Sequence, residues 1–408
     1  MKKQSLRLRA RPVTLVLLAL TVSGCANLGT QVEPGLPKTA AYPKDQAIVM
    51  LLPTAAEGRL GEAVDAIQSG YNAALARDPD HSRKPAMEDT SLDALAAFET
   101  AAGASPPPLI IGPLLKKNVN AVAEARSEQS PPMLALNEAN RSQAGIYQFA
   151  LAPEDEAKTA AQIINDLSES QTGSLKTAIV YPRADDWGER MRTAFVAALD
   201  DAPVAEIPYT AGGAGDLRDQ VSGADIVFMV ARPNDAATVY EGLGGGDAGM
   251  PVIATSHAAD SKADAADKAG LFYVDVPWLV DQEMAREYIA RSPSKPKSAH
   301  TKGELGRLYA MGIDAYYLGG LVANGGRAPS APLALPAGMT GDLKFTTTGR
   351  LMSRRLVLGR IGEGGATGLA AAEDIAAAAE AKAAAKAGES GAADGSNEAD
   401  GSNDADEA

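Results

Sequence analysis

Residues 47–53, AIVMLLP, form an unbroken apolar run that ends at a proline. A strand buried on both faces of a parallel sheet has this composition, because neither of its faces meets water. Apolar residues then recur at helical spacing over residues 60–76. A buried strand followed by an amphipathic helix predicts an α/β fold, in which helices cover both faces of a mostly parallel sheet.

The same alternation continues along most of the chain. Short apolar runs predict further strands at residues 109–111, 133–136, 177–181, 224–230 and 251–255, and a final pair of strands at 343–345 and 356–361. Amphipathic segments predict helices at residues 115–126, 154–167, 188–199, 235–243 and 303–322. A second series begins near residue 153. We therefore expect a body over residues 45–365 with two lobes, the second at about residues 153–275.

The N-terminal 24 residues are typical of a secretion signal. Five lysines and arginines precede an apolar run of ten residues from Val13 to Val22. A bilayer span needs roughly 20 apolar residues, so this run fits the core of a cleaved signal better than a transmembrane helix. The signal closes on Val22-Ser23-Gly24-Cys25, which resembles a lipobox, the motif whose cysteine receives a lipid. The alternative is an ordinary signal peptide with a chance cysteine.

Cys25 is the only cysteine in the chain, so no internal disulfide is possible. Ala26 follows it, a residue that in similar lipoproteins accompanies transfer to the outer membrane. Residues 25–44 are rich in proline and predict a tether. We expect residues 366–408 to form a tail that is first alanine-rich and then acidic and disordered. The formal net charge of −14, without a basic stripe, argues against a nucleic acid partner.

Several strings, in order, carry a resemblance to a known family. They are the apolar runs at residues 47–53 and 109–114 and the segments at 132–137, 147–157, 185–188, 251–257 and 275–279. Together they resemble the LppC/LpoA family of lipoproteins that activate penicillin-binding proteins, over about residues 45–362. The combination of Tyr147–Ala157, Thr255–His257 and Pro277-Trp278 is the most specific part of the match.

The resemblance implies a two-lobed fold similar to type I periplasmic binding proteins. It also implies a non-enzymatic role for a lipoprotein on the periplasmic face of the outer membrane. In this role the lipoprotein binds and stimulates a bifunctional, class A penicillin-binding protein and so regulates peptidoglycan synthesis. Longer members carry an N-terminal helical-repeat domain; here only residues 26–44 lie in that place. The alternative function is that of a lipid-anchored solute-binding protein for an amino acid or small metabolite.

The residues that could carry chemistry are few. Hydrolytic or transfer chemistry needs an activated nucleophile or a paired acid and base. The chain has three histidines, and no Ser-His-Asp, phosphate-loop or metal-ligand motif is evident. His81 and His300 lie in polar segments and are expected to be solvated. His257 ends a predicted strand, and we expect it to be a hydrogen-bonded capping residue. The sequence thus predicts no enzyme, metal or cofactor.

Candidate contact residues come from the ends of the predicted strands, where open parallel sheets place their clefts. Asp185 and Asp186 are neighbours and should point apart, one of them as a helix N-cap. Core packing is the expected role of both tryptophans, although an exposed one would be a good interface anchor. The candidate cleft or interface residues are Thr54, Gly112, Pro113, Asn137, Asp186, Trp187, Ser256, His257 and Trp278. Thr54, Gly112 and Pro113 lie where amino-acid-binding relatives hold a carboxylate, but no arginine or tyrosine evidently completes such a site.

Overall fold

The computed structural model describes residues 47–380, apart from residues 79–83, 104, 171–173, 211, 214–216, 246–249, 261–264 and 326–331. Cys25, the predicted tether at 25–44 and the end of the predicted tail lie outside the described residues, as does His81. Among the described helices, none combines the length and the apolar character that a membrane crossing requires.

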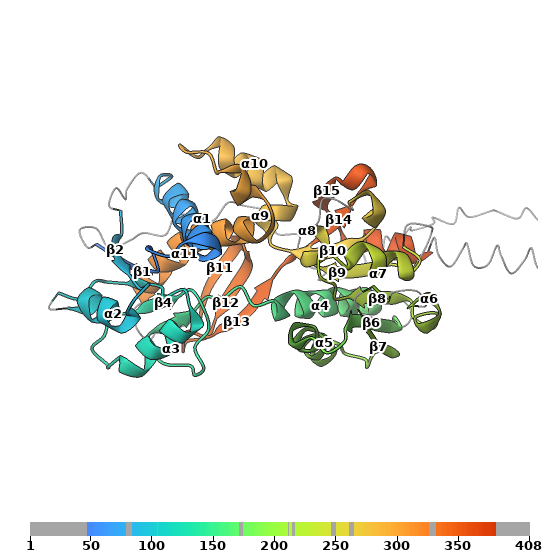
Figure 1. Cartoon of the computed structure of the whole chain (residues 1–408), viewed down its shortest axis with the longest axis horizontal. Coiled ribbons are helices and arrows are strands. Elements are labelled where there is room, and N and C mark those ends of the chain that lie inside the picture. Colours follow the sequence, from blue (N-terminus) through green and yellow to red (C-terminus); the bar gives the residue numbers. More distant parts are fainter. Residues whose placement is uncertain are drawn as a thin grey trace, which may run out of the picture. The chain divides into compact units, whose positions relative to one another are not determined.

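The first lobe is built on a five-stranded parallel sheet in the order β2-β1-β3-β4-β5 (Figure 1). Its strands are β1 (Val49–Leu52), β2 (Ala86–Asp89), β3 (Ile110–Ile111), β4 (Met133–Ala135) and β5 (Ile146–Gln148). Alternate residues of β1 enter two different apolar clusters. Met50 packs with Tyr71 of α1 (Gly58–Leu75), and Leu51 packs with Phe98 of α2 (Ala94–Ala102), so the sheet is buried on both faces as predicted.

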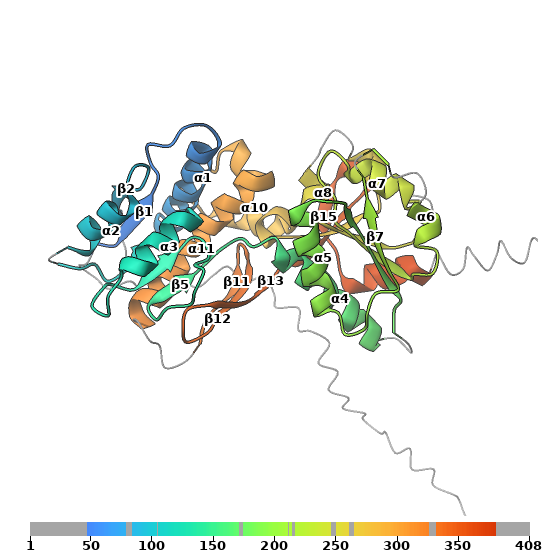
Figure 2. The ribbon, with the colours of Figure 1, turned by 60° about the horizontal axis from the view of Figure 1, so that its bottom comes forward.

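Helix α1 lies against α11 (Gly303–Gly325), although more than 200 residues separate them in the chain (Figure 2). A Cβ atom added at Gly312 would lie 2.1 Å from the carbonyl oxygen of Ile67, and one at Gly70 would lie 2.0 Å from that of Tyr309. Only glycine allows the two backbones to approach so closely. The backbones of α1 and α11 are therefore in direct contact. On the other face of the sheet, α3 (Lys116–Ala125) packs with α2.

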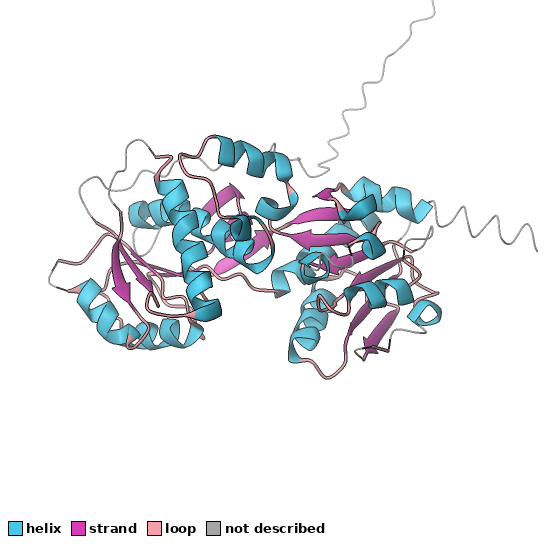
Figure 3. Ribbon diagram, turned by 45° about the horizontal axis from the view of Figure 1, so that its top comes forward, coloured by secondary structure: helices cyan, strands magenta, loops and turns pink. Residues whose placement is uncertain are grey.

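The second lobe contains a seven-stranded sheet in the order β15-β14-β10-β9-β8-β6-β7. Its five parallel strands are β6 (Thr177–Pro182), β7 (Ala205–Tyr209), β8 (Ile226–Met229), β9 (Val252–Thr255) and β10 (Phe272–Asp275). Two antiparallel strands complete it, β14 (Val357–Ile361) and β15 (Thr367–Leu369). Helices and strands alternate along the chain in this lobe as in the first, and Figure 3 shows helices around the strands.

The two faces of this sheet are covered by different helices. Phe228 packs with Phe195 of α5 (Asp186–Ala198) in a cluster that also holds residues of α4 (Glu154–Ser170). Met229 instead packs with Val239 of α7 (Ala236–Gly242) and with the short helix α6 (Leu217–Gln220). The predicted sheet covered on both sides is therefore confirmed in the second lobe.

The predicted strands at residues 343–345 and 356–361 are both present, and they belong to different sheets. Residues 343–345 fall in β12 (Gly341–Phe345), which pairs with β11 (Leu333–Gly338) and β13 (Leu351–Arg355) in a separate three-stranded antiparallel sheet. Strand β14 pairs with β10 instead. Strand β13 was not predicted, because three of its five residues are polar and it forms no apolar run.

Ordered structure continues beyond the predicted end of the body at residue 365. Strand β15 pairs with β14, and residues 372–380 are helical, with Ile375 only 1% exposed. The second lobe therefore takes strands from residues 357–369 as well as from the expected 153–275. Ile375 belongs to the main apolar cluster, and Ala372 and Ala376 pack against that cluster, so burial of these side chains holds the segment to the body.

An aromatic cluster joins α11 to α9 (Pro277–Val280) and α10 (Gln282–Ala290). The indole Nε1 of Trp278 donates to the carbonyl oxygen of His300, 2.9 Å away, and the His300 ring stacks on Tyr309. His300 is 2% exposed and its Nε2 lies 3.2 Å from Asp65 of α1. The prediction that His300 is solvated is wrong, because the 3₁₀ turn Ser298–Thr301 folds it against α1 and α11.

Candidate functional site

The carboxyl ends of β6, β8 and β9 bring three loops of the second lobe together. The loop after β6 leads into α5, the residues after β8 include Arg232, and β9 runs directly into the short helix α8 (His257–Asp260). Neighbouring parallel strands end at the same edge of a sheet, so side chains that follow them gather there. This edge holds four of the candidate residues: Asp186, Trp187, Ser256 and His257.

Asp185 caps the N-terminus of α5. Its Oδ1 accepts from the backbone N–H of Gly188 at 3.0 Å, which confirms the predicted N-cap at one of the two neighbouring aspartates. Its Oδ2 accepts from Arg232 at 2.9 Å. Burial acts to raise the pKa of Asp185, but the hydrogen bonds from Arg232 and Gly188 outweigh it and hold the pKa below its ordinary value. Ala184, just before the cap, has a φ of 55°, a strained conformation for a residue with a Cβ.

Trp187 lies between Arg232 and His257. The guanidinium carbon of Arg232 stands 4.3 Å from the centroid of the indole ring, and the His257 ring meets the indole edge-on, with centroids 5.1 Å apart. Trp187 is 8% exposed, so its expected core role is confirmed, although Arg232 above it is 44% exposed. Burial, and next the charge of Arg307, lower the pKa of His257 and so favour the neutral imidazole.

Ser256 is fully buried and bonds to a carboxylate from the start of α4. Its backbone N–H donates to Oε2 of Glu156 at 2.8 Å and its hydroxyl donates to Oε1 at 2.7 Å. Burial raises the pKa of Glu156 to about 7, although Arg307 and the hydrogen bonds from Ser256 act to lower it. A serine beside a carboxylate resembles a nucleophile and its base, but this serine is 0% exposed and no substrate reaches it in this conformation.

Arg307 of α11 holds two further carboxylates at the same edge. It donates to both oxygens of Asp275, each at 2.8 Å, and to both oxygens of Asp260, at 2.8 and 3.1 Å. Forked contacts of this kind are the strongest that a guanidinium makes with carboxylates. The helix that packs on α1 in the first lobe is thereby tied to β10 and α8 in the second.

The remaining candidates lie elsewhere. Thr54 is exposed after β1, and the amide of Asn137 donates to the carbonyl oxygen of Leu114 at 2.9 Å, after β4. Gly112, joined to Pro113 by a cis peptide, has a φ of 102°, and a Cβ there would lie 2.2 Å from the carbonyl oxygen of Leu51. These residues share the carboxyl edge of the first sheet, where they shape loops. Trp278 is 3% exposed within the aromatic cluster, so it is a core residue without a contact surface.

Sequence reasoning missed the charged partners of the site. Glu156 lies 100 positions before Ser256, and Arg307 lies 32 positions after Asp275. In the sequence, Glu156 is one of several acids at the start of the helix predicted at residues 154–167, and no local motif marks Arg232 or Arg307. Among the described residues, no group of three or more histidines and carboxylates is arranged to hold a metal ion.

The family model LppC, a lipoprotein family, matches residues 41–207 and 212–351, well over half of the chain. Two curated relatives are each named penicillin-binding protein activator LpoA. The protein from Enterobacter sp. is 30% identical over 312 residues, covering 63% of this chain and 41% of its own length. The one from Haemophilus influenzae is 28% identical over 289 residues, covering 66% and 47%. The chain thus spans less than half the length of these relatives.

Solved structures show the same fold. The C-domain of Haemophilus influenzae LpoA, described as a regulator of PBP1A, aligns with a TM-score of 0.61 at 24% identity, covering 80% of this chain and 100% of that one. A branched-chain amino acid ABC transporter protein from Chromobacterium violaceum aligns with a TM-score of 0.63 at 26% identity, covering 77% and 99%. The expected fold, similar to periplasmic binding proteins, is confirmed. On the extent of the family match, this chain belongs to the LppC lipoprotein family.

Proposed function

We propose that this chain is an outer-membrane lipoprotein that binds a class A penicillin-binding protein from the periplasmic face and stimulates its peptidoglycan synthesis. The observation that carries the proposal is the family match, which covers both lobes within residues 41–351. It is supported by the relatives named as activators of penicillin-binding proteins. Side chains at the sheet edges are available for contact with a partner, since Thr54, Asp186 and Arg232 are accessible there.

The role we propose is one of contact without catalysis. The serine–carboxylate pair at the second-lobe edge is buried and engaged in structural hydrogen bonds. Two arginines are likewise bound to carboxylates, Arg232 to Asp185 and Arg307 to Asp260 and Asp275. Side chains held in this way suit a rigid contact surface better than a catalytic site. We propose that Trp187, Ser256 and His257 give that surface its shape and that Asp186 can touch the partner.

The membrane anchor we propose is a lipid on Cys25. Replacing Cys25→Ala in cells should leave the protein unlipidated, so that metabolic labelling with a fatty acid analogue is lost and the chain no longer fractionates with the outer membrane. Cys25 is the only cysteine, so labelling through a thioether has no other acceptor. Labelling that persists in the Cys25→Ala variant would contradict the anchor.

The activator function is tested with the full-length chain and the class A synthases of the same bacterium. Addition of the chain should raise the rate of peptidoglycan cross-linking by a synthase that it binds, whereas an unrelated lipoprotein with the same anchor should not. A chain that neither binds any class A synthase nor changes its cross-linking rate would overturn the proposal.

The same preparation tests the solute-binding alternative. A ligand present at about 100 times its dissociation constant stabilises the folded state by about 2.7 kcal/mol. We expect no amino acid in a thermal-shift panel to stabilise the chain in this way. A specific amino acid that does so, in a chain without effect on the synthase, would favour the solute-binding function.

A further inference from the structure

Within the described part of the chain, strand β2 forms an open edge of the first sheet. It pairs with β1 on one side, and it ends the strand order β2-β1-β3-β4-β5. The N–H of Ala86 donates to Ile48 and that of Thr90 donates to Leu52. Successive residues of a strand direct their backbone groups to opposite sides, so Met87 and Asp89 point theirs away from β1. An edge of this kind is a template for a further strand.

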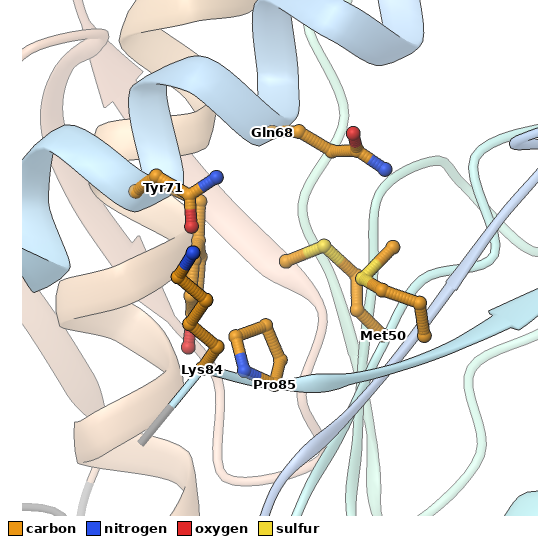
Figure 4. Close-up of a pocket in the computed structure, with 7 residues that line it drawn as sticks. Met50, Gln68, Tyr71, Lys84 and Pro85 are labelled. Carbon is orange, nitrogen blue, oxygen red and sulfur yellow. The ribbon is translucent and has the colours of Figure 1, made fainter. Parts of the chain in front are cut away.

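A cavity opens beside this edge, on the face that α1 covers (Figure 4). Met50 and Met87 are directly paired in the two strands, so both side chains lie on this face. Tyr71 comes from α1, and Pro85 comes just before β2. The complete lining is Met50, Gln68, Tyr71, Asn72, Lys84, Pro85 and Met87. Thioether side chains adapt to the shape of an apolar group that enters.

The size of the cavity suits a single side chain. Its volume is about 120 Å³, and an apolar cavity of about 150 Å³ is known to accept a benzene ring. Met87 is 40% exposed, so the cavity communicates with the surface at the strand edge. A strand laid along β2 would direct alternate side chains to this face, which places one of them at the cavity.

The positive charge of Lys84 at the edge of the cavity restricts which charged side chains an added strand can have. Lys84 is the one charged residue in the lining, and it is exposed. Strand β2 itself carries Glu88 and Asp89, so Lys84 is the positive group at the other end of this edge. A carboxylate on the incoming segment would complement Lys84, whereas a second ammonium would be repelled.

Two of the other edges of the large sheets, β5 and β7, are less suited to this role. In the first sheet, the N–H of Gln148 at the end of β5 donates to Gly349, so a loop already occupies that side. In the second sheet, β7 contains Pro208, which lacks a backbone donor and is a usual protection of an edge strand. Strand β2 contains no proline, so each of its residues has a backbone donor.

We propose that β2 and the cavity beside it form the docking site for an extended segment of the penicillin-binding protein. This segment adds a strand to the sheet. It inserts a large aliphatic side chain between Met50 and Met87 and places a carboxylate near Lys84. The inference rests on the proposed function and specifies the surface through which that function operates. The segment gains main-chain hydrogen bonds from Met87 and Asp89 and specificity from the cavity.

The test compares three full-length variants in binding to the class A synthase. Met87→Glu places a charge at the cavity, and Met87→Pro removes the outward N–H of β2. Each should weaken binding at least tenfold, since each removes an interaction that the added strand requires. Met352→Glu is the matched control, because Met352 is 60% exposed on β13, another edge strand. It should bind within twofold of the natural chain. Circular dichroism and thermal melting establish that each variant is folded.

A second measurement does not depend on variants. Hydrogen exchange followed by NMR should show the amides of Met87 and Asp89 protected when the synthase is bound. If the natural chain binds the synthase, but Met87→Glu binds equally well and these amides stay unprotected, the docking site is wrong while the activator function stands. If the natural chain binds no class A synthase, the activator function and the docking site both fail.

Discussion

The carboxylate of Glu156 receives two hydrogen bonds from Ser256, one from its backbone N–H and one from its hydroxyl. The two residues come from the first turn of α4 and the end of β9. This contact fixes the helix that leads the chain into the second lobe against the edge of its sheet. Because the carboxylate is buried, its protonation affects the stability of the body.

The stability of the body should decrease as the pH rises from about 4.5 to about 7 and change little above that. The pKa of Glu156 is raised to about 7 by burial, from an ordinary value near 4.5. An acid whose pKa is raised in the folded state contributes fully below its unfolded pKa, and that contribution is lost as the pH rises through the folded pKa. The loss between pH 5 and pH 8 should be at most about 3 kcal/mol. Urea unfolding at several pH values measures it.

Glu156→Gln is the control for this titration. Glutamine mimics the protonated acid and keeps one oxygen that can accept from Ser256. The variant should show a nearly flat stability over the same pH interval, apart from the small contributions of exposed groups. A variant whose stability falls with pH as steeply as that of the natural chain would exclude Glu156 as the cause.

Removing the charge of Arg307 should destabilise the body strongly. Arg307→Met leaves Asp260 and Asp275 without the guanidinium that holds them, and breaking a buried ion pair from one side typically costs about 3–5 kcal/mol. Chemical denaturation measures the change. Arg355→Met is the matched control, because Arg355 is 61% exposed and 3.9 Å from its partner Asp166, so the effect there should be below about 0.5 kcal/mol.

Gly312→Ala should separate α1 from α11. The added methyl group would lie 2.1 Å from the carbonyl oxygen of Ile67, a backbone atom that cannot move without shifting the whole helix. We expect a loss of stability of about 2 kcal/mol or more, as for other overpacked contacts. The control is Gly223→Ala, where the added Cβ meets nothing within 4 Å. Equal melting temperatures of the two variants would contradict the direct backbone contact of α1 and α11.

Asp185→Ala should cost about 1–2 kcal/mol, because it removes both the N-cap of α5 and the partner of Arg232. Asp185→Asn keeps an oxygen for the N–H of Gly188 but loses the charge, so it should cost less. Asp186→Ala is the control, since the neighbouring side chain is exposed and is not the N-cap. Urea midpoints of the three variants, in this order of stability loss, check the assignment. If the Asp186→Ala chain were the least stable of the three, the assignment of Asp185 as the N-cap would be wrong.

Local patterns in the sequence predicted most of the parallel strands, although the buried strand β10 was missed. The apolar runs at β1, β6, β8 and β9 are buried on both faces, and this burial is what produces such runs. Short or amphipathic strands such as β2, β7 and β13 were missed, because an edge strand needs few apolar residues. The pairing of the strands was not predicted, since the register of β14 with β10 depends on residues about 85 positions apart.

The candidate site was predicted in part for the same reason. Trp187, Ser256 and His257 follow apolar runs, so their position at a sheet edge was visible in the sequence. Their partners Glu156, Arg232 and Arg307 come from distant segments and meet them only after folding. His300 shows the opposite error, because its polar, loop-like neighbourhood in the sequence did not reveal that its side chain enters the core.

The placement of the two tryptophans gives the chain separate optical reporters. Trp187 lies under a guanidinium beside an imidazole in the second lobe, whereas Trp278 packs among tyrosines next to α11. A chain with Trp187→Phe would emit from the aromatic cluster alone, and one with Trp278→Phe from the sheet edge alone. Fluorescence can therefore follow each region independently, without an attached dye.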